Sequence, residues 1–313
     1  MKTVLESVLF VFKLCGIYME ENEGKWYKVK RLLFAIYSIF ICVFIWADNV
    51  RLLIIMAIED DIRRQLSFLV FVLMYIIISF YYTLFLRLMN CKLPAILKAF
   101  QNYHEEYDLT FDSKRWRKNI KILSVVSVLI YGVDVVGGTV IYNMSFLSEK
   151  SILNMQLYPA NQISNQGIYL SMVFFVLLKL IYTIAFHNYL IIFFCIISRV
   201  ITKEYIHVTE KIKTYVKHLT DDEFYDSTEI SSIRKHHTAI TDLMTATNDV
   251  MKHIAAIQYS VTIPIVCLIL YGLIHGKLVT EDITILSFNI ILHFLIMILI
   301  THLGSKLSEE VCR

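Results

Sequence analysis

Residues 167–198 read GIYLSMVFFVLLKLIYTIAFHNYLIIFFCIIS, and this stretch decides the fold. It runs for 32 residues and contains one charged residue, Lys179. A helix needs about 20 apolar residues to cross the hydrocarbon core of a bilayer. The stretch therefore predicts a transmembrane helix, and its surplus length indicates that the helix continues into the cytoplasm.

Apolar runs of this kind recur along the chain. Hydrophobic residues make up 57% of the 313 residues and charged residues only 18%, whereas about a quarter of a soluble domain is charged. With 3 Pro and 9 Gly there are few turn signals, so long helices are expected. Six spans are predicted, at 32–57, 67–90, 119–142, 167–198, 253–275 and 283–303. We therefore expect an all-α, polytopic membrane protein whose transmembrane helical domain covers residues 1–303.

The distribution of Lys and Arg orients these spans. Residues 1–31, 88–118, 199–252 and the tail after 303 together carry 22 Lys and Arg, against 4 in the three alternate loops. The positive-inside rule places the rich segments in the cytoplasm, with both termini. The sequon Asn143-Met144-Ser145 falls in a loop on the outer side, where Asn143 would be glycosylated. A multi-pass protein of the plasma membrane is expected.

Two segments outside the spans have amphipathic patterns. Residues 4–19, VLESVLFVFKLCGIYM, predict a helix on or dipping into the membrane surface. Residues 199–252 predict a cytoplasmic helical anchor segment with two apolar stripes. The stripes consist of Ile206, Ile212, Val216 and Leu219, and of Ile233, Ile240, Leu243, Val250 and Ile254, with Thr247 on the second face. These helices either cover one another or pack against neighbouring subunits.

Ionisable residues inside a span are costly, so each is a candidate functional residue. Asp48 and Arg51 lie one helical turn apart in the first span and are expected to pair with each other. Asp134 in the third span and Lys179 in the fourth have no such neighbour on their own helix. They either pair with each other or face a wet cavity. His187 lies deeper in the fourth span, and His293 lies near the middle of the sixth.

Aromatic residues gather at the outer depth of Asp134, while Lys179 lies near the centre of the fourth span. An aromatic wall with a few polar anchors is typical of small-molecule pockets, although aromatic belts at membrane interfaces have the same composition. The candidate ligand-binding residues are Tyr75, Tyr131, Asp134, Tyr169, Phe174, Lys179 and Tyr271.

Other functional classes find little support in the sequence. No catalytic constellation or phosphate-binding loop is visible, so we expect neither an enzyme nor a cofactor. The adjacent His236 and His237 point about 100° apart on a helix and have no partner at metal-ligand spacing. The net charge of +3 does not indicate a nucleic-acid partner. A six-span transporter or a structural membrane protein remains an alternative, although no internal repeat is visible.

Two stretches resemble a known family. Residues 13–39, KLCGIYMEENEGKWYKVKRLLFAIYSI, are similar to the opening of the insect gustatory and odorant receptors. Residues 236–273, HHTAITDLMTATNDVMKHIAAIQYSVTIPIVCLILYGL, resemble the family's cytoplasmic helix that runs into the fifth span. The gustatory branch is favoured, with the odorant branch second.

The resemblance implies a ligand-gated cation channel, a homo- or hetero-tetramer of seven-span subunits in the lipid bilayer. A tastant or odorant would bind in an outer-leaflet pocket, and the seventh span would line the pore. The family's TY-hydrophobic-QF run in that span has no match here. We therefore expect residues 304–313 to be a truncated cytoplasmic tail.

Overall fold

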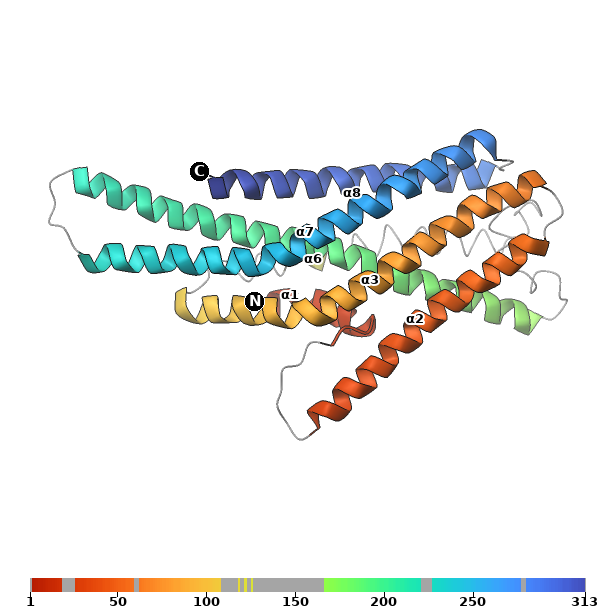
Figure 1. Cartoon of the computed structure of the whole chain (residues 1–313), viewed down its shortest axis with the longest axis horizontal. Helices are drawn as coiled ribbons and strands as arrows, with labels where there is room; N and C mark the ends of the chain where they lie inside the picture. Colours follow the sequence, from red (N-terminus) through yellow and green to blue (C-terminus); the bar gives the residue numbers. More distant parts are fainter. Residues whose placement is uncertain are drawn as a thin grey trace.

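The protein is a bundle of long helices in the computed structural model (Figure 1). The structure describes residues 2–18, 26–58, 62–107, 166–220, 227–276 and 280–312, with positions 118, 121, 122 and 125. Its elements over the long described ranges are α1 (Lys2–Leu14), α2 (Tyr27–Ile58), α3 (Ile62–Tyr107), α6 (Gln166–Thr220), α7 (Ser227–His275) and α8 (Thr280–Cys312). The described ranges contain no strand, so the all-α prediction is confirmed.

Five of these helices, α2, α3, α6, α7 and α8, are long and apolar enough to cross a membrane. They correspond to the first, second, fourth, fifth and sixth predicted spans, and make the chain a multi-pass membrane protein. The third predicted span, 119–142, lies almost wholly outside the described residues, as does Asn143. Apolar side chains such as Ile39, Phe40 and Ile298 stay exposed, as expected for helices surrounded by lipid.

Helices α6 and α7 run well past the length of a bilayer. They contain 55 and 49 residues, which corresponds to about 80 Å and 75 Å at 1.5 Å per residue. Figure 1 shows the end of α6 and the start of α7 together at one end of the bundle, opposite the α7–α8 connection. The helical character expected for residues 199–252 is therefore present, apart from 221–226, which lie outside the described residues.

The second predicted stripe is a buried face of α7. Ile240, Leu243, Thr247 and Val250 are all at most 3% exposed. The first stripe differs, because Val216 near the end of α6 is 52% exposed. The buried residues of this part of α6 lie further toward the membrane and include Val208.

Helix α1 is an integral part of the bundle. Its spacing of three and four residues places Leu5, Val8 and Phe12 on one face, and all three are fully buried. The ring of Phe12 lies 6.1 Å from that of Phe186 and 5.7 Å from that of Phe193, both on α6. The predicted helix is confirmed, but its apolar face contacts protein, and its position relative to the membrane surface stays a prediction.

Helix α1 ends in a Schellman motif. Gly16 has a φ of 88°, the left-handed conformation that glycine adopts most easily. Its N–H donates to the carbonyl of Lys13 at 3.0 Å, and the N–H of Ile17 donates to that of Phe12 at 2.9 Å, which is the pairing of this motif. Side chains from two other helices satisfy further carbonyls of this end. Tyr82 of α3 donates to Cys15 at 2.7 Å, and Ser38 of α2 donates to Gly16.

Candidate functional site: a buried polar network between α2, α3 and α6

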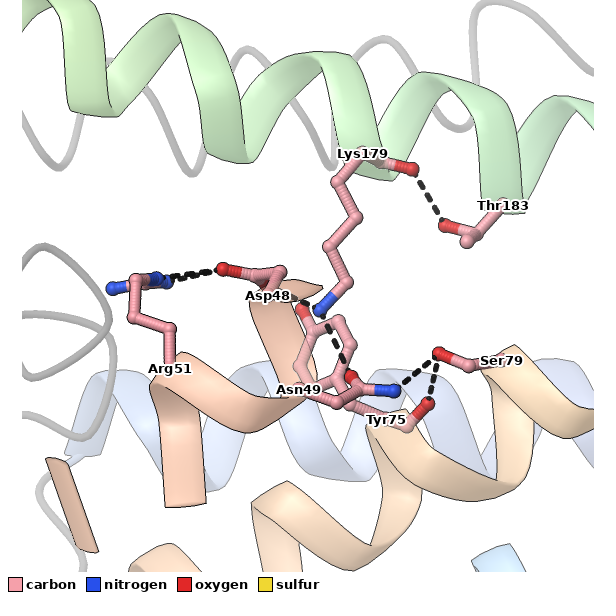
Figure 2. A network of polar contacts seen from close by, with 7 residues as sticks. All are labelled: Asp48, Asn49, Arg51, Tyr75, Ser79, Lys179 and Thr183. Carbon is pink, nitrogen blue, oxygen red and sulfur yellow. Dashed lines mark hydrogen bonds and ion pairs between the residues drawn. The ribbon is translucent and has the colours of Figure 1, made fainter. Parts of the chain in front are cut away.

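A buried ion pair joins α2 to α6. The ammonium of Lys179 lies 2.5 Å from Oδ2 of Asp48, and the two residues are 1% and 2% exposed. Figure 2 shows the Lys179 side chain pointing away from its helix toward the carboxylate. Each charge has therefore left solvent only because the other is within reach.

The same carboxylate binds a second cation. Nε of Arg51 donates to Oδ1 of Asp48 at 2.7 Å, from one turn further along α2. The expected pairing of Asp48 with Arg51 is thereby confirmed. The two oxygens of Asp48 serve different cations, so one carboxylate organises charges from two helices (Figure 2).

The third helix contributes an aromatic face. The ammonium of Lys179 lies 3.9 Å from the centre of the Tyr75 ring of α3, a cation–π contact. Oδ1 of Asn49 lies 3.5 Å from the same ammonium. An ammonium has three N–H donors, and the neighbours of this one are a carboxylate, an amide oxygen and an aromatic ring.

Uncharged side chains complete the arrangement. Nδ2 of Asn49 donates to Oγ of Ser79 at 2.8 Å, and that hydroxyl donates to the carbonyl of Tyr75 at 2.7 Å. On α6, Thr183 donates to the carbonyl of Lys179 at 3.0 Å. We call these seven residues the Lys179 network: Asp48, Asn49, Arg51, Tyr75, Ser79, Lys179 and Thr183.

The chemistry of the Lys179 network favours a fixed helix arrangement. Removing one partner of a buried pair leaves an uncompensated charge and costs about 3–5 kcal/mol. Lys179 is 1% exposed, so a ligand would reach its ammonium only after the helices move. In the arrangement described, the network holds α2, α3 and α6 in one register.

The seven candidate ligand-binding residues have different surroundings. Tyr75 and Lys179 come together in the Lys179 network, and Tyr169 is half-buried beside Val173 and Val176 on α6. Phe174 is 66% and Tyr271 46% exposed, and the ring contact of Tyr271 is with His275, not with the network. Tyr131 and Asp134 lie outside the described residues.

Sequence reasoning left two possibilities for Lys179, a pair with Asp134 or a wet cavity. The partner that the structure describes is Asp48 instead. The residues that sequence reasoning missed are Asn49, Ser79 and Thr183, because a single amide or hydroxyl in an apolar span carries no charge to attract notice.

A second polar cluster lies among the helix segments outside the predicted spans. Nε2 of His236 on α7 is 2.9 Å from the hydroxyl of Tyr103 on α3, and the Tyr103 hydroxyl lies 3.3 Å from Oε2 of Glu204 on α6. The ring of Tyr107 stacks on His236 with centroids 4.4 Å apart. Burial, followed by the charge of nearby Lys211, lowers the pKa of His236 to about 4. A hollow of about 370 Å³ adjoins His236.

Comparison with solved structures identifies the helix arrangement. No protein-family model and no curated protein matches the sequence. The insect olfactory receptor OR5 from Machilis hrabei superposes with a TM-score of 0.65, covering 98% of this chain and 80% of that chain at 14% identity. This chain has the fold of an insect olfactory receptor. The same receptor solved in complex with eugenol gives a TM-score of 0.65 at 15% identity, with the same coverage.

The olfactory-receptor fold confirms the fold expected from the sequence. At this level of identity the likeness concerns the fold, so the ligand and the physiological branch belong to the proposal below.

Proposed function

We propose that the protein is a chemosensory receptor subunit of the insect type, which binds a small molecule among its membrane helices and gates a cation current. The observation that carries the proposal is the olfactory-receptor fold over 98% of the chain. One structure with this fold holds eugenol, a small phenol. The sequence resemblance points to the same superfamily through different features, the opening before the first span and the helix leading into the fifth.

The ligand would bind in the outer half of the bundle. The seven candidate residues remain the predicted contacts: Tyr75, Tyr131, Asp134, Tyr169, Phe174, Lys179 and Tyr271. Besides the predicted contacts of Tyr75 and Lys179, the Lys179 network would have a positioning role, because its charges are already paired and its helices carry four of the predicted contacts. Ligand entry that shifts α6 against α2 would strain a buried ion pair, which offers a physical link between binding and gating.

Taste and smell are two candidate settings for this function. The sequence texture favours a tastant and the gustatory branch. The eugenol complex of a receptor with the same fold favours an odorant as the second candidate. In either setting we propose a plasma-membrane protein with cytoplasmic termini that assembles into homo- or hetero-tetramers. The 52% exposed Val216 on α6 would then face a neighbouring subunit.

The test expresses the chain in cells and applies eugenol, other volatile phenols, sugars and bitter alkaloids. A cation current evoked by one class, matched by ligand-dependent thermal stabilisation of the purified protein, would support the proposal and select the branch. The matched variants are Lys179→Met and the triple variant Asp48→Asn/Arg51→Gln/Lys179→Met, which removes all three charges that meet at Asp48. A positioning role predicts that the triple variant recovers the response, whereas a direct ligand contact by Lys179 predicts that both variants lose it. Absence of both current and stabilisation across the panel would argue against a small-molecule receptor.

A further inference from the structure

Two histidines meet inside the bundle, deeper along α6 than the Lys179 network. His187 of α6 and His293 of α8 have ring centroids 6.2 Å apart. The ring of Tyr81 from α3 lies 5.2 Å from that of His187. Both histidines fall in predicted spans, where water is scarce and polar groups need partners within the protein.

Each imidazole has one nitrogen that the described chain leaves unsatisfied. Nε2 of His187 and Nδ1 of His293 are buried, and neither has a hydrogen-bond partner among the described residues. A neutral imidazole carries one donor and one acceptor, so each bare nitrogen has a definite hydrogen-bonding requirement. Leaving such a group unsatisfied costs about 1–3 kcal/mol.

The polar groups on α3 and α7 near His187 bond one another. The hydroxyl of Tyr81 donates to Oε1 of Gln258 at 2.7 Å, and Nε2 of Gln258 donates to Thr262 at 3.0 Å. Gln258 and Thr262 are buried on α7, 1% and 0% exposed. These bonds join α3 to α7, whereas Nε2 of His187 on α6 and Nδ1 of His293 on α8 have no partner among the described residues.

The separation of the two rings has a simple geometric interpretation. A direct N–H···N bond of about 2.9 Å brings two imidazole centroids to roughly 5 Å. A single water molecule bonded to both nitrogens at about 2.8 Å places the centroids roughly 6–7 Å apart when its two bonds meet near the tetrahedral angle. The observed 6.2 Å is too long for the direct bond and suits one intervening water.

We propose that His187 and His293 hold a buried water molecule that joins α6 to α8 inside the membrane. Water can donate to one nitrogen and accept from the other, donate to both or accept from both, so it fits every tautomer of the pair. Buried waters of this kind bond polar groups that would otherwise be unsatisfied. The site is distinct from the ligand region and does not depend on the proposed receptor function.

The experiment compares the full chain with His187→Phe, His293→Phe and the double variant in one detergent, with the melting temperature as the readout. Phenylalanine keeps the ring shape and removes the nitrogens. If the two histidines share a water, each single variant strands the other nitrogen and lowers the melting temperature by several degrees. The double variant then recovers most of the loss, because no unsatisfied nitrogen remains. His302→Phe, at an exposed position of α8, is the matched control and should change little.

The opposite result has a definite form. Without a shared water, each Phe removes an unsatisfied nitrogen, so both single variants melt at or above the wild-type temperature and their shifts add. That outcome overturns the proposal. A second set, His187→Gln and His293→Gln, covers the case in which a Phe variant does not fold. Glutamine keeps a donor and an acceptor, so each Gln variant should melt closer to the wild type than a His→Ala variant at the same position. Equal losses for Gln and Ala would also overturn the proposal.

Discussion

Asp48 and Lys179 are 131 positions apart in the sequence, yet their side chains form an ion pair of 2.5 Å in the interior of the bundle. The pair ties the first membrane helix to the fourth, and Tyr75 adds the second through its ring. A contact between charges inside a membrane protein restricts how its helices can slide, since a buried charge is left undercompensated when its partner moves away.

The substitution Lys179→Met should lower the free energy of unfolding by about 3 kcal/mol, because it leaves the carboxylate of Asp48 buried with Arg51 as its one remaining described cation. Melting of the detergent-solubilised protein measures the loss. The matched control is Lys252→Met, which removes an ion pair of similar length, 2.6 Å to Asp249, between side chains about half exposed. Exposed pairs contribute less than about 1 kcal/mol, so the control should melt near the wild type. Equal losses of stability in the two variants would show that the buried Lys179 pair stabilises the protein no more than the exposed Lys252 pair does.

Gly16→Ala should destabilise the protein by about 1–3 kcal/mol. The residue has a φ of 88°, and an added Cβ would lie 2.8 Å from Oγ of Ser38. Gly304→Ala is the matched control, since Gly304 lies in α8 and has nothing within 4 Å of an added Cβ. Alanine there should be neutral or stabilise by up to about 1 kcal/mol through helix propensity. Opposite signs for the same chemical change are expected in one thermal-unfolding series, and a Gly16→Ala protein that melts at the wild-type temperature would contradict the close approach of α1 to α2.

The stability of the protein should fall as the pH is lowered, because His236 is buried in its neutral form. Its pKa is lowered from 6.5 to about 4, chiefly by burial and then by Lys211 and His207, while Glu106 acts in the opposite direction. Between these two values the unfolded chain binds a proton that the folded chain excludes, so stability is full above pH 6.5 and declines toward pH 4. Melting temperatures across this range should fall less steeply for His236→Gln than for the wild type. His237→Gln, at the exposed neighbouring position, should follow the wild-type slope. Identical slopes for all three proteins would exclude His236 as the group responsible.

The predicted topology can be checked on intact cells. An epitope at the N-terminus should bind antibody only after permeabilisation, since that end carries the excess of Lys and Arg. Asn143 should carry a glycan that slows the protein on a gel. The Asn143→Gln variant should lack the glycan and migrate faster. Surface labelling of the N-terminal epitope on intact cells would reverse the orientation of every span.

The sequence was sufficient to locate the five described membrane helices, because an apolar run of bilayer length with few charges is rare outside membrane spans. It also held an unused signal for the main ion pair. Counted from residues 57 and 167, the outer ends of their predicted spans, Asp48 lies nine residues deep and Lys179 twelve, or roughly 14 Å and 18 Å. Opposite charges at similar depth on different helices are natural partners. The sequence analysis paired Asp48 with Arg51 on the same helix, so it did not consider Asp48 as a partner for Lys179.

Other features could not be deduced from the pattern. The apolar face of α1 contacts α6, although the same periodicity suits a helix on a lipid surface, since both environments bury one stripe. Phe174 and Tyr271 are exposed, whereas Tyr75 is half-buried against Lys179. Aromatic residues are common at lipid interfaces and in pockets alike, so residue type alone does not separate the two settings.

Helix α7 runs unbroken from Ser227 to His275 and holds Pro264 near its far end. Proline removes one backbone hydrogen bond, to the carbonyl of Ser260, and allows a helix to bend at that point. The stretch before it buries Ile240, Leu243 and Val250 and contains no such break. If α7 bends at Pro264, the stretch before it would move as one stiff unit. A small change of angle at Pro264 would then displace Ser227 by many ångströms, because 37 residues of helix separate the two positions.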